Sequence, residues 1–332
     1  TSKILLIVFM LGEDIYRLFY GTIRSITGNT ENIAFLPDRR KFVSQIAVII
    51  ASINVGSIIF GAVKGRYNYK VHHTTLEFDD LPESFDGFTI TQISDIHSGS
   101  FSDPEEVLTG IRLANEQKSD VMFFTGDLVN SRADEMEPWI EHFNQLDAPY
   151  GKFSTMGNHD YGDFYKWPSK EHKVANLQKL KDTHKAIGFQ LLDNDAIRLE
   201  KNGEHINILG VENWGLPPFP QKGDLEKAAE NCGDKEFNVL LSHDPTHWTE
   251  KVIDYHKKIH LTLSGHTHGM QFGIEIPGWF KFSPVQFKYK NWAGLYEKKD
   301  QYLYVNRGFG YLAFPGRVGI WPEITVIELK KA

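Results

Sequence analysis

The chain has 332 residues and a net charge of −7, with 43 acidic and 36 basic residues interspersed along it. This length allows one large domain plus an appendage, and the charge pattern excludes a general nucleic-acid binder, so we expect no nucleic-acid partner. The single cysteine, Cys232, excludes both an internal disulfide framework and a thiolate metal cluster.

Residues 1–41 form the first segment, in which an apolar run is interrupted by charge. Residues 4–11 are strongly apolar, but Glu13, Asp14 and Arg17 follow at once. This pattern indicates either the end of a truncated spanning helix or an interfacial amphipathic helix. Because the chain begins at Thr1 rather than Met, we also expect further sequence upstream, with room for more membrane helices.

Residues 42–63 carry no charged side chain and have the length that a bilayer-spanning helix requires. Basic residues bracket this run, at 39–41 before it and at Lys64 and Arg66 after it. Several serines lower its hydropathy, so a buried core helix is the alternative. We predict a transmembrane helix over residues 42–63, followed by a linker and lead-in over residues 64–85.

The charges around this helix also predict its orientation. Five basic residues between positions 17 and 41 favour the cytoplasmic side, although Lys64, Arg66 and Lys70 count against this reading. Residues 38–43 resemble a twin-arginine export motif, or else carry simple stop charges. Both readings predict a cell-membrane protein in which the domain that follows this helix is extracytoplasmic.

Five short polar motifs follow, each directly after an apolar run typical of a buried strand. They are Asp95-Ile96-His97, Gly126-Asp127, Gly157-Asn158-His159-Asp160, Ser242-His243-Asp244 and Gly265-His266-Thr267-His268. Any one of them is common by chance, and a lone histidine is more often packed or solvated than a ligand. Because loops that leave the carboxyl ends of strands share one edge of a sheet, all five motifs together predict one convergent site.

The residue types at this site suit two divalent metal ions. Imidazole is a ligand for Zn and Fe, and carboxylate oxygens suit Mn, so the identity stays open among these three. Asp127 could bridge both ions with its two oxygens, while Asn158 would ligate without adding negative charge. Two such ions can activate a water and clamp the oxygens of a phosphoryl transfer.

The order of these motifs between residues 88 and 268 resembles the calcineurin-like metallophosphoesterases. The resemblance implies an α/β fold of two packed mixed β-sheets flanked by helices, over residues 86–332. It implies a first metal bound by Asp95, His97 and His268, a second bound by Asn158, His243 and His266, and Asp127 between them. It further implies that His159 is a catalytic histidine that protonates the leaving oxygen or steadies the phosphate, with Asp160 orienting it.

The tail at residues 317–325, together with the N-terminal anchor, is similar to a membrane-associated bacterial branch of this family. That branch includes enzymes that cleave the pyrophosphate of UDP-diacylglucosamine. Because this lipid is made inside the cell, it disagrees with an outward-facing domain. A lipid-linked phosphoester therefore stays one option among the phosphoester substrates that the resemblance implies.

Other parts of the chain carry weaker signals. We expect a helix over residues 102–117 capped by Ser102, and late strands at 302–305 and 324–329 that complete the second sheet. Residues 276–296 are rich in aromatics and lysine, which indicates either a loop that touches lipid or a packed loop over the C-terminal strands. Arg307, and Trp214 with its neighbours Glu212 and Asn213, are candidates for substrate contacts.

The sequence as a whole predicts a phosphodiesterase or pyrophosphatase that acts at the membrane. We expect a hydroxide that bridges the two metals near Asp127 to attack phosphorus in line, while His159 protonates the departing oxygen. The alternative is a membrane-anchored, metal-dependent scaffold or sensor that binds phospholipid or nucleotide without turnover.

Overall fold

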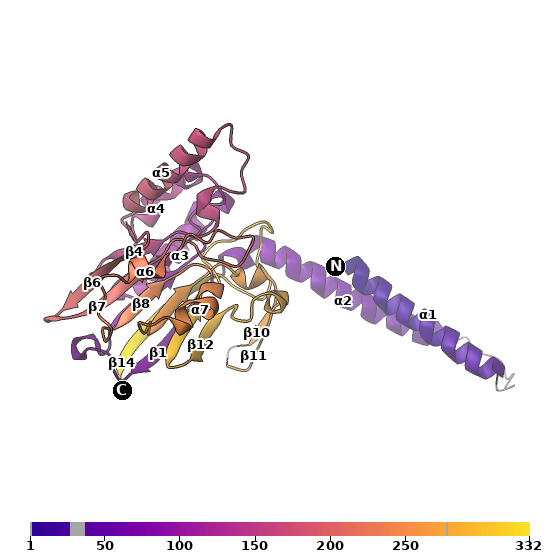
Figure 1. Cartoon of the computed structure of the whole chain (residues 1–332). Helices are drawn as coiled ribbons and strands as arrows, with labels where there is room; N and C mark the ends of the chain where they lie inside the picture. Colours follow the sequence, from indigo (N-terminus) through magenta and orange to yellow (C-terminus); the bar gives the residue numbers. More distant parts are fainter. Residues whose placement is uncertain (1, 27–36, 277) are drawn as a thin grey trace. The chain divides into compact units, whose positions relative to one another are not determined.

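The computed structural model describes residues 2–26, 37–276 and 278–332 (Figure 1). The chain divides into two compact units, Thr1–Val63 and Lys64–Ala332. The predicted segment 64–85 contains strand β1 (Lys70–Phe78), which belongs to a sheet of the second unit.

The first unit contains two helices that contact each other, α1 (Ser2–Ile26) and α2 (Pro37–Val63). The stretch Ser44–Val63 of α2 has a mean hydropathy of 2.3, and 17% of its most apolar window is buried. Among the described residues, α2 is the one helix long and apolar enough to cross a membrane, on length and composition. Helix α1 carries Asp14 and Arg17 within it.

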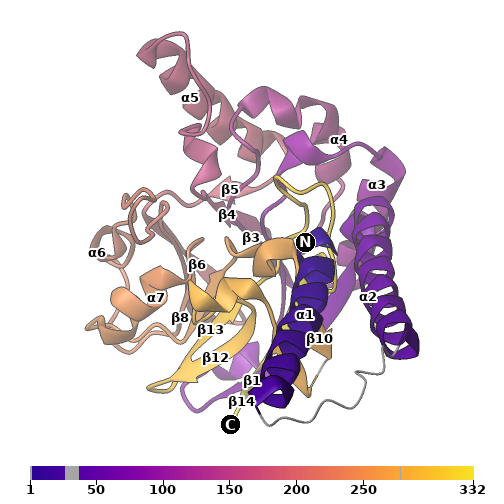
Figure 2. The same cartoon turned by 90° about the vertical axis from the view of Figure 1, so that its right-hand side faces the viewer.

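The second unit is built on two six-stranded mixed sheets (Figures 1 and 2). The first sheet has, in spatial order, β1, β14 (Glu323–Lys331), β2 (Thr89–Ile93), β3 (Val121–Thr125), β4 (Lys152–Thr155) and β5 (Gln190–Leu191). The second has β12 (Gly294–Lys298), β13 (Gln301–Val305), β9 (Leu261–Ser264), β8 (Asn238–Leu241), β7 (Glu204–Gly210) and β6 (Asp195–Lys201). A separate hairpin pairs β10 (Ile274–Ile276) with β11 (Phe280–Phe282).

The sheets pack face to face through one apolar cluster. It joins side chains of the first sheet, such as Phe123 and Ile327, to side chains of the second, such as Val239 and Leu263. All five residues of β3 are buried, as the run Val-Met-Phe-Phe-Thr predicts for a strand covered on both faces.

Helices cover the outer faces of both sheets. Helices α3 (Pro104–Glu116), α4 (Ile140–Phe143) and α5 (Lys170–Ala186) pack on the first sheet, and α6 (Leu225–Ala228) and α7 (Thr246–Glu250) pack on the second. This arrangement confirms the predicted fold of two mixed sheets flanked by helices.

Two local predictions were wrong. The N-cap of α3 is Asp103 rather than Ser102, because the Asp103 carboxylate accepts from the backbone N–H groups of Glu105 and Glu106. Strand β14 does not complete the second sheet. It lies in the first sheet between β1, to which it is parallel, and β2, to which it is antiparallel.

Candidate metal centre

Five loops place the predicted site residues together at one edge of the two sheets. Strands β2, β3 and β4 are parallel, as are β8 and β9, so the motifs that follow them leave from the same edge. Two glycines make room for the carboxylates. A Cβ at Gly157 would lie 2.2 Å from Asp127 Oδ1, and one at Gly265 would lie 2.2 Å from Asp95 Oδ2.

Most of the candidate ligands have a left-handed backbone. The φ angle is 51° at Asp95, 47° at His97, 60° at Asp127, 71° at His266 and 51° at His268. Non-glycine residues rarely adopt this conformation, and it tends to cluster where a side chain must be aimed at a site.

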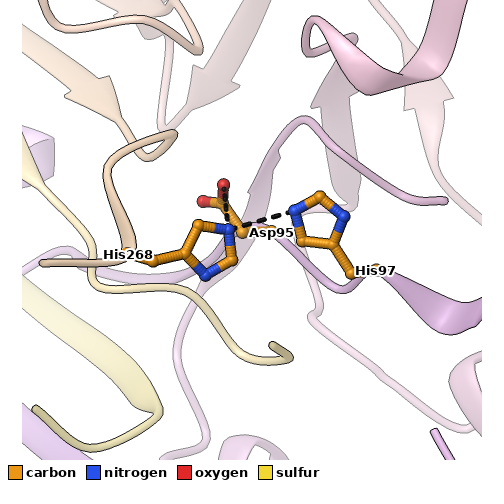
Figure 3. A group of neighbouring side chains, drawn as sticks. All are labelled: Asp95, His97 and His268. Atoms are coloured by element: carbon orange, nitrogen blue, oxygen red, sulfur yellow. Dashed lines mark hydrogen bonds and ion pairs between the residues drawn. The ribbon is translucent and has the colours of Figure 1, made fainter. Parts of the chain in front are cut away.

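The first donor cluster consists of Asp95, His97 and His268, all buried (Figure 3). His268 Nε2 lies 3.2 Å from Asp95 Oδ1 and 3.0 Å from His97 Nε2. Two ring nitrogens at this separation repel each other unless a proton or a cation lies with them, so the geometry fits a cation site.

The second donor cluster consists of Asp127, His243 and His266. Asp127 Oδ2 lies 3.2 Å from His243 Nε2 and 3.5 Å from His97 Nε2, so this one carboxylate faces both clusters. Asn158 adds an oxygen, because its Oδ1 lies 2.7 Å from His266 Nδ1.

The hydrogen bonds of His243 show which of its nitrogens is free to ligate. Its Nδ1 lies 2.7 Å from the carbonyl oxygen of Thr125, to which a protonated Nδ1 donates. That bond selects the tautomer whose Nε2 carries a lone pair, and Nε2 is buried without a hydrogen-bond partner. His243 Nε2, which faces Asp127, is therefore suited to bind a metal ion, as the family resemblance implies for this histidine.

Electrostatics favour the ligating protonation states of most of these side chains. Burial opposes charge on Asp95 and Asp127, but the facing histidines hold the pKa of both carboxyls well below the usual range. Burial lowers the pKa of His97 and of His266, which keeps those rings neutral. Burial opposes protonation of His243 as well, yet the Asp127 charge raises its pKa to about 10. A bound cation and this proton would therefore compete for the same nitrogen.

His159 lies beside both clusters and lines the cavity above them. Its Nδ1 is 2.7 Å from the carbonyl oxygen of Asn130, and its ring stacks on Phe164 at a centroid distance of 4.4 Å. Its ring also meets the His97 ring edge-on at 4.9 Å. Nδ1 is thus engaged by the protein, which leaves Nε2 for a substrate.

The hydrogen bonds of the Asp160 carboxylate go to backbone N–H groups rather than to the His159 ring, so its orienting role stays a prediction. Its Oδ2 accepts from the backbone N–H groups of Asp127 and Gly157, at 2.9 and 2.8 Å. Its Oδ1 accepts from those of Leu128 and Val129, at 2.8 and 3.4 Å. Asp160 therefore holds the loop that carries Asp127, and the direct hydrogen bond of the His159 ring is with the Asn130 carbonyl.

The cavity at the site has a volume of about 350 Å³ and is lined by candidate ligands, by His159, and by Lys288 and Tyr289 from the aromatic segment. The Tyr289 hydroxyl lies 2.8 Å from His266 Nε2. The sequence singled out the aromatic segment but not this contact, because Tyr289 follows His266 by more than twenty residues without any motif of its own.

Two further buried residues lie against candidate ligands, and the sequence assigned neither of them a role. Asp244 Oδ2 lies 3.5 Å from His266 Nε2, and Arg317 Nη2 lies 3.2 Å from His268 Nδ1. The position of Asp244 directly after His243 was the available signal. Arg317 belongs to the tail segment that carried part of the family resemblance.

The weaker candidates for substrate contacts lie elsewhere. Arg307 is 4% exposed at its side chain and pairs with Glu323 and Glu275, so it is a structural cation rather than a substrate contact. Trp214 stacks on His247 at 5.1 Å, and Glu212 accepts from Tyr161 and Asn194. Asn213 is fully buried, and its side chain donates to the carbonyl of Pro220.

Comparison with known proteins gives a family match for each of the two units of the chain. The model of the calcineurin-like phosphoesterases matches residues 88–270, and that of a probable calcineurin-like phosphoesterase transmembrane domain matches residues 1–66. The uncharacterized metallophosphoesterase YkuE of Bacillus subtilis is 31% identical over 301 residues, which cover 88% of this chain and 97% of that protein.

Two other relatives show how the match extends to the membrane part. A transmembrane protein with a metallophosphoesterase domain from Danio rerio is 29% identical over 86% of this chain, but the match covers only 62% of that protein. An uncharacterized metallophosphoesterase of Helicobacter pylori (strain ATCC 700392 / 26695) is 27% identical over 99% of this chain and 80% of its own length. With a family match over more than half of its residues, this chain belongs to the calcineurin-like phosphoesterases and is a metal-dependent phosphoester hydrolase that carries a transmembrane domain.

Proposed function

We propose that the chain hydrolyses a phosphodiester or a pyrophosphate at a membrane surface with two divalent metal ions. The observation that carries this proposal is the pair of donor clusters, which meet at the Asp127 carboxylate and open, with His159, into one cavity.

The donors divide into two ligand sets. Asp95, His97 and His268 would hold one ion, Asn158, His243 and His266 the other, and Asp127 would bridge them. A mixed set of imidazole, carboxylate and amide oxygen suits Mn, Zn or Fe. When bound, two such ions supply an activated water as the nucleophile and neutralise charge on the phosphoryl oxygens.

His159 would complete the reaction as the proton donor. With Nδ1–H donated to the Asn130 carbonyl, the ring is held so that the proton on Nε2 can pass to the departing oxygen. The leaving group then departs as a neutral hydroxyl or a protonated phosphate, and Nε2 regains its proton from solvent. Lys288, which also lines the cavity, would attract the anionic substrate.

A second cavity favours a substrate with a group beyond the phosphorus. This cavity of about 470 Å³ shares Lys288 and Tyr289 with the catalytic cavity, so the two adjoin. Trp248 and Tyr296 give it apolar and aromatic walls, and Lys290 adds a further cation. A diester or pyrophosphate could place its second substituent there, whereas phosphate monoesters of small alcohols would leave it empty.

The charges of the membrane part bear on the side of the membrane where the catalytic unit would lie. The basic residues between positions 17 and 41 favour the cytoplasmic side, which would put the catalytic unit outside the cell membrane. A lipid-linked phosphoester is the substrate within closest reach of an enzyme anchored in this way.

The test combines metal counting with turnover. The full chain would be purified in nanodiscs, its metals counted by mass spectrometry, and its hydrolysis of bis-p-nitrophenyl phosphate compared with that of the monoester before and after chelation. Two metals per chain, preference for the diester and loss of activity on chelation are expected. Asp163→Asn, at an exposed aspartate paired with Lys173, is the matched control for Asp127→Asn. Two bound metals without turnover of diester, monoester or pyrophosphate would favour the binding scaffold instead.

A further inference from the structure

The hairpin β10–β11 presents its apolar side chains to solvent and its polar ones to the protein. In its register Ile276 pairs with Phe280, and these side chains are exposed by 45% and 48%. Ile274 is exposed by 58%, and Trp279 at the turn by 81%. We call Ile274, Ile276, Trp279 and Phe280 the hairpin surface. Hairpins of soluble proteins alternate the other way, with the apolar face inward.

The opposite face of the hairpin explains why this orientation is stable. Glu275, which alternates with Ile274 and Ile276, is half-buried, and its two carboxylate oxygens accept from Nε and Nη2 of Arg307. Its cross-strand partner Lys281 donates to the carbonyl of Ala293 and lies over the ring of Tyr296. The polar face is thus fastened to the second sheet, which keeps the apolar face turned outward.

The base of the hairpin lies next to the point where the catalytic unit begins. Gly273 N–H donates to Val318 O at 2.9 Å, and Phe272 pairs with Val318. The next residue back, Arg317, packs against Gly65, where an added Cβ would lie 2.3 Å from the Arg317 carbonyl oxygen. Helix α2 ends at Val63, only two residues before Gly65. A two-residue link spans at most about 7 Å, so the chain tethers the end of α2 within that reach of Gly65, whatever the orientation of the helix.

We propose that the hairpin surface inserts into the lipid interface of the membrane that the chain itself crosses. Tryptophan and phenylalanine beside lysines favour that interface, where aromatic rings reach the acyl boundary and cations meet anionic headgroups. Lys288 and Lys290 follow the hairpin and are exposed. The tether keeps the surface at the bilayer at a high effective concentration, so even weak insertion is maintained.

Docking in this way would bring the catalytic cavity to the headgroup layer. Met270 and Lys288, which flank the hairpin in sequence, both line that cavity. If the proposed hydrolase activity holds, the phosphoester would be presented from the headgroup region of a lipid. The docking itself does not depend on turnover.

The experiment measures depth in the bilayer and needs no substrate. The full chain would carry Trp279→Cys, labelled with nitrobenzoxadiazole, in nanodiscs of phosphatidylcholine and phosphatidylglycerol. The native Cys232 is buried, and the unsubstituted chain serves as the labelling blank. Val174→Cys is the matched control, because Val174 is an apolar residue exposed by 68% on α5.

The label at position 279 should emit at shorter wavelength than the label at position 174. It should also lose most of its emission when lipids with a nitroxide near the headgroup are included, while the label at 174 keeps its emission. Phe280→Cys should repeat the result from a second position. Equal, unquenched emission at 279 and 174 would overturn the proposal. A short-wavelength emission at 279 that lipid nitroxides do not quench and that fades on dilution would also overturn it, because a second copy of the chain would then cover the surface.

Discussion

Replacing Asp160 by asparagine distinguishes a residue that holds a loop from one that orients a catalytic histidine. Each of the two oxygens of the Asp160 carboxylate accepts hydrogen bonds from two backbone N–H groups. An amide has only one acceptor oxygen, which it would keep on the two well-formed bonds from Asp127 and Gly157. Its NH₂ group would then face the N–H groups of Leu128 and Val129, which are donors as well.

The cost follows from this count. Losing the bond from Leu128 to a charged acceptor costs about 1.5–3 kcal/mol, and leaving that buried N–H unsatisfied adds about 1–3 kcal/mol. Burial and the nearby Asp127 charge raise the pKa of Asp160 to about 7, so removing the charge relieves some repulsion. We therefore expect a net loss of about 2–4 kcal/mol, which corresponds to a Tm lower by roughly 5–12 °C in a unit of this size.

Thermal unfolding of the full chain in nanodiscs, followed by tryptophan fluorescence after chelation, measures this loss without a contribution from bound metal. Asp163→Asn is the control, because that surface pair should contribute no more than about 1 kcal/mol. The opposite outcome would be an unchanged Tm together with a loss of turnover as large as that of His159→Gln. Asp160 would then act through the His159 ring, and the loop-holding argument would be refuted.

Four further outcomes are expected. His159→Gln should lower kcat by about 10²–10⁴-fold while mass spectrometry still counts the same metals; loss of metal would make His159 a ligand. Asp127→Asn should weaken both metal sites, each by at least ~100-fold in a chelator titration, since even residues behind ligands cost 10–100-fold; two tightly held metals would contradict the bridge. Arg307→Met should cost about 3–5 kcal/mol of stability, because Glu323 stays buried without its partner. It should leave KM unchanged. A raised KM at an unchanged Tm would instead indicate that Arg307 contacts the substrate. Burial opposes the charge of Glu323, but Arg307 lowers its pKa from 4.5 to about 2, so its stabilisation is complete above pH 4.5 and is lost as the pH falls toward 2. An acid titration of Tm should show this loss, and Glu323→Gln should flatten that part of the profile.

The convergence of the donors could be predicted because it follows from strand order and burial. The residues before Asp127 form a fully buried strand, and parallel neighbours bring its loop beside those of Asn158 and Asp95. Both the buried strand and the polar residue at its end can be recognised from the local sequence pattern. The roles of the seven candidate ligands and of His159 stay predictions.

Contacts that depend on how a loop closes could not be read from the sequence. Asp160 follows His159 directly, yet its carboxylate accepts from the backbone of a different loop. Arg307 looked available after a strand, but β14 enters the first sheet and brings Glu323 against it. Tyr289 reaches His266 only because the aromatic segment folds back over the site.

The left-handed backbone at five candidate ligands has a consequence for the life of the protein in a cell. Each such residue costs on the order of 1 kcal/mol, which is a sizeable share of the 5–15 kcal/mol that holds a typical domain together. Metal coordination offsets this cost, because an ion that binds only the folded chain stabilises it. A chain that failed to acquire its metals would keep the strain without the compensation, unfold more often and be degraded sooner. Abundance in the cell would then report on metal supply before any loss of catalysis did.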